Sequence, residues 1–460
     1  MKKSLFITII IAFYLFLSWP THALKASERY SLPDSLNTNE GNRSDILEAG
    51  DSEVALTLQY RPRSEYRNGY RAPLYDSLKP AFVTNQRSRI GLNYKNSDFQ
   101  SRIAFQDVRT WGEPVIKQDV STFLLHEAWF EWAVTPDFSM KIGRQVLKYD
   151  DQRLLAASNW NNVGATHDLL LLKYQKPHYH LHLGLAYNND QNRMSEAYFQ
   201  YPANFYKTMQ FLSASATLGQ NLQLSFLEIA DGRQQEGSDN TILYRTTLGL
   251  NGSYISDAEN LLLSAKTYWQ GGKSAKGNRI NAWFLAFHAS YNIDRFRFTL
   301  GGDYFSGDDA LDTTDRVNNA FNNLYGSGHG YYGSMDYFRV IDKHTLGGGL
   351  RDLYVKLGYG ITEKTSVNLA YHDFALANRV IDPNYTGNGL KALPRELGTE
   401  LDFALNHSFS QEFQVKLGYS FMFAKESMSV IKGGDHHRIA NWGFVMLTFQ
   451  PRIFIHQLSR

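Results

Sequence analysis

Cysteine is absent from the 460-residue chain. Its absence excludes a lipid anchor attached to cysteine, disulfide crosslinks and metal sites built on thiolates. Beyond its N-terminal segment the chain also has no apolar run that approaches the roughly 20 residues needed for a membrane-spanning helix. A helical membrane protein is therefore excluded, and noncovalent packing has to hold the fold together.

Proline and net charge are also low. The chain has only 12 Pro, and its formal net charge is +2, which gives no reason to expect a nucleic-acid partner. In contrast, 28 Tyr, 29 Phe and 35 Gly are present. This balance favours many strands and turns over helices.

Residues 1–23 have the pattern of a Sec signal peptide. Two lysines precede a short apolar run, and small residues ending at Ala23 provide a cleavage site. The polar stretch 24–50 is expected to be a flexible segment. No linker divides the remaining chain, so we expect residues 51–460 to form one barrel.

From Glu53 onward, segments of about ten residues alternate between apolar and polar side chains and end in turns. Examples are "HYHLHLGLAY" at 178–187 and "FQVKLGYSFMF" at 413–423. We count about eighteen such strands, and an even number is typical of outer-membrane barrels. The pattern predicts an all-β fold, a transmembrane antiparallel up-and-down β-barrel.

The connections between these strands alternate in length. Short turns are expected at 96–98, 135–137 and 410–412, whereas the longest loop runs from Gly307 to Gly349. Short periplasmic turns and long extracellular loops are typical of bacterial outer-membrane barrels. The bacterial outer membrane is therefore the predicted location, with its lipid as a contact.

One face of the segment 413–423 suits lipid and the other suits water. A soluble barrel with an apolar interior would produce the same alternation in a single strand. The choice of a membrane barrel rests on the signal peptide, the strand number and the loop asymmetry. The residues expected to face lipid are Phe413, Val415, Leu417, Tyr419, Phe421 and Phe423.

If the apolar faces meet lipid, the opposite faces line the lumen, and basic residues dominate there. Rings of Arg and Lys favour anions in a pore with low-dielectric walls, so an anionic solute is predicted. The alternative is that mixed charges pair with one another and merely hydrate the interior. The basic positions predicted to line the pore are Arg87, Arg89, Arg102, Lys141, Arg245, Lys266, Arg297, Lys356 and Lys416.

The segment "MKIGRQVLKYDDQRLLAASNWNN" at 140–162 passes from a strand into a charged stretch. We interpret Asp150, Asp151 and Arg153 as part of a pore mouth or constriction rather than a catalytic site. Arg144 is harder to place, because alternation with Ile142 puts it on the lipid side unless the strand has a bulge or has reached the rim.

Other motifs do not indicate chemistry. "GHGYYG" at 328–333 has the spacing G-x-G-x-x-G, but it opens no helix in a strand-helix-strand unit. His178, His180 and His182 share one face of a strand without a further ligand beside them, which favours polar lumen lining. The carboxylates at 306–319 lack the spacing of a calcium loop. No cofactor, metal site or catalytic residue is expected.

Several segments resemble the alginate-export family of outer-membrane barrels. They are "LHEAWFEW", "MKIGRQVLKYDDQRLLAASNWNNVGATHD", "GGDYFSGDD", "NNLYGSGHGYYGSMDYF" and "GGLRDLYVKLGYGITEKTSVNLAYHDF". The resemblance implies an 18-stranded monomeric barrel with an electropositive constriction that passes an anionic polysaccharide such as alginate by facilitated diffusion. The matching positions are Arg89, Arg144 and Arg153, with Asp150 and Asp151 beside them.

The predicted function is a passive, porin-like outer-membrane channel for anionic saccharides, with periplasmic export or uptake components as further partners. Three alternatives stay open: a porin for general or other solutes, a barrel enzyme, and a closed structural barrel. An ordered hydrolytic triad at the rim would favour the enzyme, and a plugged lumen without conductance would favour the structural barrel.

Overall fold

The computed structural model describes residues 52–113, 123–192, 194–195, 199, 205–238, 241–312 and 317–458. The signal peptide expected at 1–23 and the flexible segment expected at 24–50 lie outside these residues.

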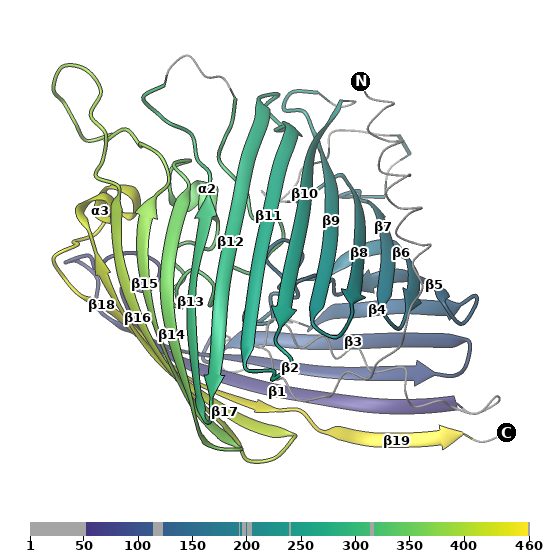
Figure 1. Ribbon diagram of the computed structural model, residues 1–460. Helices are drawn as coiled ribbons and strands as arrows, with labels where there is room; N and C mark the ends of the chain where they lie inside the picture. The colour runs from purple at the N-terminus through teal and green to yellow at the C-terminus, as the bar shows by residue number, and fades with distance from the viewer. Residues whose placement is uncertain are drawn as a thin grey trace. The chain divides into compact units, whose positions relative to one another are not determined.

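The described residues form one antiparallel sheet (Figure 1). Its strands are β1 (Ser52–Asn68), β2 (Ala81–Lys95), β3 (Phe99–Thr110), β4 (Phe123–Ala133), β5 (Phe138–Gln145), β6 (His167–Lys176), β7 (Tyr179–Tyr187), β8 (Thr208–Leu218), β9 (Leu222–Gln234), β10 (Ile242–Ile255), β11 (Leu261–Lys273), β12 (Arg279–Ile293), β13 (Phe296–Phe305), β14 (Leu350–Thr362), β15 (Thr365–Leu376), β16 (Glu396–Ser408), β17 (Phe413–Ala424), β18 (Ala440–Phe449) and β19 (Arg452–Leu458).

The sheet closes on itself through β1. Strands β18 and β19 both pair with β1, on either side of a break that contains Pro451. Proline has no N–H to donate, but its carbonyl accepts a hydrogen bond from Leu58 N at 3.2 Å and continues the ladder. Strands β18 and β19 therefore act as one interrupted strand, and the predicted closed barrel of 18 antiparallel strands is confirmed.

The alternation predicted for 413–423 is present in β17. Tyr419 and Phe421 are exposed on the outside of the barrel, whereas Gly418, Ser420 and Met422 are buried inside. Because successive side chains of a strand point to opposite faces, the apolar set covers the outer wall and the polar set reaches the lumen.

Long connections lie at one end of the barrel and short turns at the other. Two short helices belong to the long connections, α2 (Ile341–His344) between β13 and β14, and α3 (Glu426–Lys432) between β17 and β18. Among the described residues, no helix is long and apolar enough to cross a membrane.

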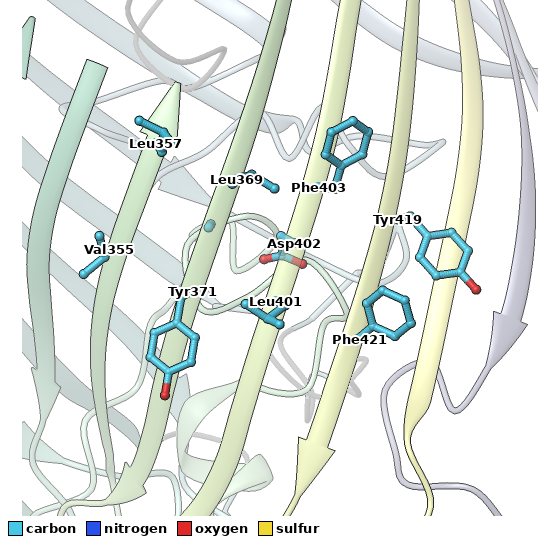
Figure 2. A pocket seen from close by; sticks show the side chains of 10 residues that line it. Val355, Leu357, Leu369, Tyr371, Leu401, Asp402, Phe403, Tyr419 and Phe421 are labelled. Carbon is cyan, nitrogen blue, oxygen red and sulfur yellow. The ribbon is translucent and has the colours of Figure 1, made fainter. Parts of the chain in front are cut away.

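A shallow apolar groove of about 550 Å³ crosses the outer wall over β14 to β17 (Figure 2). Val355, Leu369 and Leu401 line it and are 43–53% exposed, and the Tyr371 and Tyr419 rings lie at its sides. Since these side chains point away from the lumen, the groove belongs to the lipid-facing surface and not to the solute pathway.

Candidate solute pathway in the lumen

Two connections fold into the barrel and contact its inner wall. We call residues 146–166, between β5 and β6, the crossing loop, and residues 306–349, between β13 and β14, the long loop. Buried apolar residues of both loops, including Leu155 and Phe338, join the same core cluster as inward-facing strand residues such as Phe284 and Trp442. The pathway is therefore shaped by loops as well as by strands.

The crossing loop first contacts the wall formed by β9 to β11. The Asp150 carboxylate accepts hydrogen bonds from Ser225 Oγ on β9 at 2.6 Å, Asn251 Nδ2 on β10 at 2.7 Å and the Tyr268 hydroxyl on β11 at 3.2 Å. Lys266 Nζ on β11 lies 2.6 Å from the Asp151 carboxylate. These contacts hold the start of the loop deep inside the barrel, not only at its mouth.

Arg153 is buried where the crossing loop meets the long loop. Its guanidinium lies 2.5 Å from the Asp303 carboxylate on β13 and 3.3 Å from Asp151. It also lies 4.3 Å from the centre of the Tyr331 ring and 5.3 Å from that of Tyr332, both in the long loop. Arg153 therefore joins two loops and one strand in a charged, aromatic cluster.

Carboxylates hold the long loop in place. Glu400 on β16 accepts a hydrogen bond from Met335 N at 2.7 Å. A side chain at Gly333 would meet this carboxylate, since an added Cβ would lie 2.5 Å from Glu400 Oε2. Within the loop, Asp336 contacts His329 Nδ1 at 2.8 Å and accepts a hydrogen bond from Tyr70 OH. Burial alone raises the pKa of Asp336, but the His329 and Tyr70 contacts outweigh it and lower this pKa to about 2.

The crossing loop next reaches the wall formed by β1 and β2, where it meets arginines. Arg61 donates to the Asn159 carbonyl at 2.5 Å and to the Asn161 carbonyl at 3.1 Å. Arg87 donates to the Asn159 side chain at 2.9 Å and to the carbonyls of Asn159, Asn161 and Asn162 at 3.3–3.4 Å.

Arg89, next on the same face of β2, donates to the Val163 carbonyl at 3.0 Å and to Gln106 at 2.7 Å. Within the part of the chain that the structure describes, no carboxylate forms an ion pair with Arg61, Arg87 or Arg89. The acceptors of these three side chains are neutral, so none of the three arginines is held in an ion pair, although Glu65 on the same wall pairs with Arg63 at 2.8 Å.

Most of the other predicted cations face carboxylates or rings. Arg102 pairs with Glu127 at 2.7 Å, and Arg245 pairs with Asp231 at 2.8 Å. Lys141 Nζ lies 3.8 Å from the centre of the Trp129 ring. The remaining predicted pore residues are Lys356, with Nζ 4.7 Å from the Tyr354 ring centre, Arg297, which donates to Asn292 at 2.9 Å, and Lys416, on the lumen-facing side of β17.

Arg144 does not line the lumen, and its predicted pore-lining role is wrong. Its guanidinium forms two hydrogen bonds to Asp168 at 2.8 and 2.9 Å, and the two side chains are 41% and 54% exposed. The ladders of β5 continue through Arg144 without a register shift, so it stays on the outward face with Ile142. Because β5 ends at Gln145, Arg144 lies at the rim, where an outward charge is tolerated.

Two lumen arginines, Arg61 and Arg63, were not among the residues predicted from the sequence. They lie in the second half of β1, which continues past Pro62 to Asn68. The sequence does contain a pattern that indicates this strand: polar and basic residues that are buried alternate with Tyr60 and Tyr66, which are exposed. Arg63 pairs with Glu65 at 2.8 Å and lies 4.0 Å from the centre of the Trp160 ring.

One group among the described residues has the composition of a metal site. Asp435, His436 and His437 offer ligand atoms within 4.8 Å of one another in the connection between β17 and β18. His437 is 79% exposed, and its Nδ1 lies 3.0 Å from the Asp435 carboxylate. This group is outside the lumen pathway.

Comparison with known proteins places the fold and the family. OccAB4 from Acinetobacter baumannii has a TM-score of 0.56 and 11% identity, over 89% of this chain and 99% of that chain. OpdL from Pseudomonas aeruginosa has a TM-score of 0.58 and 12% identity, over 87% of this chain and 99% of that chain. OpdK from Pseudomonas aeruginosa, solved with vanillate, has a TM-score of 0.55 and 11% identity, over 88% of this chain and 99% of that chain.

At such low identities these likenesses bear on the fold alone. No curated protein matches the sequence. The family model for alginate export, however, matches residues 52–439. Because this match covers most of the chain, the protein belongs to the alginate export family and is a passive channel of the bacterial outer membrane, not an enzyme.

Proposed function

We propose that this channel passes anionic saccharides, including an anionic polysaccharide such as alginate, through a lumen lined by arginine and lysine. The observation that carries the proposal is the wall of β1 and β2, where Arg61, Arg87 and Arg89 have only neutral acceptors among the described residues. An arginine that is not held in an ion pair attracts anions more strongly than a paired one, because its field is less completely cancelled.

The chemistry of the other groups supports a saccharide as solute. The inner wall and the loops carry amide side chains, such as Asn159, Gln106 and Gln270, which hydrogen-bond within the protein and are of the chemical type that also binds sugar hydroxyl groups. A carboxylate on each sugar unit would meet the planar guanidinium groups, which bind carboxylates through two parallel hydrogen bonds.

Ion selectivity tests the proposal directly. In planar bilayers under a KCl gradient, the purified channel should show a reversal potential that favours chloride. The triple variant Arg61→Gln, Arg87→Gln, Arg89→Gln should lose most of this preference. Preference for cations in the unmodified channel would contradict the proposal.

A matched control removes a paired cation together with its partner. The double variant Arg102→Gln, Glu127→Gln leaves the net charge unchanged and lies on the neighbouring strands β3 and β4. It should keep the anion preference. Block of the current by a galacturonic acid trisaccharide, but not by neutral maltotriose, would extend the result from chloride to anionic saccharides, whereas equal block by both would contradict it.

A further inference from the structure

The part of the crossing loop that meets the arginines forms a small finger with a closed base. We use the name finger for residues 158–164. Ala165 N donates to the Ala157 carbonyl at 2.8 Å, and Asn161 N donates to the Ser158 carbonyl at 3.0 Å. The two ends of the finger are therefore tied together at its base.

We propose that the finger occupies a carboxylate-binding site formed by Arg61, Arg87 and Arg89, and that an anionic solute has to displace it to pass. This inference rests on the proposed function and adds its regulation. The carbonyl oxygens of the finger lie where the oxygens of a solute carboxylate would accept the same hydrogen bonds. The finger is thus a built-in competitor for the solute.

The site fits a negatively charged ligand better than it fits the finger. Arg61 and Arg87 are 4% and 0% exposed, and a buried guanidinium without an opposite charge is costly. The Arg61 Nε atom is buried without a hydrogen-bond partner among the described residues. A carboxylate accepts two parallel hydrogen bonds from one guanidinium and also compensates its charge, whereas a neutral carbonyl leaves that charge uncompensated. Exchange of the carbonyls for carboxylates is therefore favourable at the arginines themselves.

One side chain of the finger holds it against this exchange. The Trp160 ring stacks on His329 of the long loop, with centroids 3.9 Å apart, and packs edge-on against Phe444 at 5.0 Å. Its other face contact is the Arg63 guanidinium at 4.0 Å. The contacts of the indole involve none of the three site arginines, whereas the Trp160 carbonyl accepts hydrogen bonds from Arg63 at 2.7 Å and from Arg61 at 3.3 Å. Removing the indole should loosen the finger and leave the site intact.

The principal experiment compares Trp160→Ala with Arg87→Gln in planar bilayers, with a galacturonic acid trisaccharide as the probe. Trp160→Ala should raise the chloride conductance and lower the half-blocking concentration of the trisaccharide by roughly tenfold, the effect of losing a contact of ordinary strength. Arg87→Gln should also raise the conductance, because the finger loses several bonds, but should increase the half-blocking concentration. Unchanged conductance and block in Trp160→Ala would overturn the inference.

Trp111→Ala is the matched control. This exposed tryptophan lies just beyond β3, and its indole donates to Gln86 and not to the finger. It should behave as the unmodified channel. Migration of unheated and heated samples on gels shows which variants keep the folded barrel.

Labelling of a covered position gives a second, direct readout. The chain has no cysteine, so Gln106→Cys introduces a single thiol. Gln106 is 1% exposed and donates to the Val163 carbonyl of the finger at 2.9 Å. A charged maleimide should label Gln106→Cys several times faster when Trp160→Ala is added. Equal labelling rates in the two backgrounds would show that the finger is a fixed wall.

Failure of this inference is distinguishable from failure of the proposed function. Cation preference in the unmodified channel would remove the proposed function, whatever the finger does. Anion preference, with a finger that Trp160→Ala does not release, would leave the proposed function standing and remove only the competitor.

Discussion

The cations near β9 to β13 differ from the three site arginines, Arg61, Arg87 and Arg89, in whether a carboxylate pairs with them. On the side of β9 to β13, Arg245 pairs with Asp231, Lys266 pairs with Asp151, and Arg153 lies against Asp303. On the side of β1 and β2, the arginines of the site meet only carbonyl and amide oxygens among the described residues. A count of basic residues would rank both sides alike.

The difference teaches that pairing, and not the number of cations, decides what a lumen wall does. A buried ion pair has already satisfied its charges, so its field at a distance is weak and its loss leaves a partner stranded. An arginine held by neutral acceptors keeps its field and accepts a stronger partner when one arrives. We therefore expect substitutions on the paired side to cost stability and substitutions on the unpaired side to cost selectivity.

The largest expected effect is that of Arg153→Ala on the paired side. It strands the Asp303 carboxylate, whose side chain is 0% exposed, beside Asp151. Removal of one partner of a buried pair costs about 3–5 kcal/mol. The midpoint of urea unfolding, followed by tryptophan fluorescence with both proteins in the same detergent, should therefore lie at a clearly lower urea concentration than in the unmodified channel.

Arg87→Gln is the comparison for this measurement, because it removes a buried arginine that strands no carboxylate. It should lower the unfolding midpoint much less than Arg153→Ala. Equal losses in the two variants would break the distinction between the paired and unpaired walls.

Sequence pattern was sufficient for what strands impose locally. A period of two placed Tyr419 and Phe421 outside and Ser420 inside, and the structure agrees. The same rule set Arg144 on the outward face of β5, and the Asp168 pair at the rim confirms that placement. The expectation that Arg144 lines the pore came from the family resemblance, and the structure contradicts it.

Contacts between distant segments were beyond the reach of the pattern. Nothing periodic in residues 146–166 indicates that Asp150 meets β9 to β11 while Asn159 meets β2, since those contacts depend on the closed barrel. The division into paired and unpaired cations was hidden for the same reason. The second half of β1, with Arg61 and Arg63, was likewise not predicted, because its alternation carries charged side chains and few apolar ones.

The next expected effect concerns the pH dependence of the long loop. The pKa of Asp336 falls from 3.8 to about 2 on folding, chiefly because the His329 and Tyr70 contacts outweigh the effect of burial. A carboxyl with a lowered folded pKa stabilises the protein above its unfolded pKa, and this contribution is lost as the pH falls from 3.8 to about 2. The shift corresponds to about 2 kcal/mol at neutral pH.

Asp336→Asn should therefore lower the unfolding midpoint at pH 7 and flatten its dependence on pH between 4 and 2. Asp76→Asn serves as the control, because this carboxylate is 90% exposed and pairs with Arg438 at the surface. If Asp336→Asn keeps the full loss of stability on acidification, that loss belongs to other carboxyls and the contribution assigned to Asp336 is wrong.

The smallest expected effect is that of Arg144→Gln at the rim. Its pair with Asp168 has good geometry, but both side chains are about half exposed, and surface pairs contribute about 0–1 kcal/mol. Since the side chain points away from the lumen, the reversal potential should equal that of the unmodified channel, in contrast to Arg89→Gln on the β2 wall. A loss of anion preference in Arg144→Gln would mean that charge outside the lumen sets the selectivity, and the contrast between the two inner walls would then lose its functional meaning.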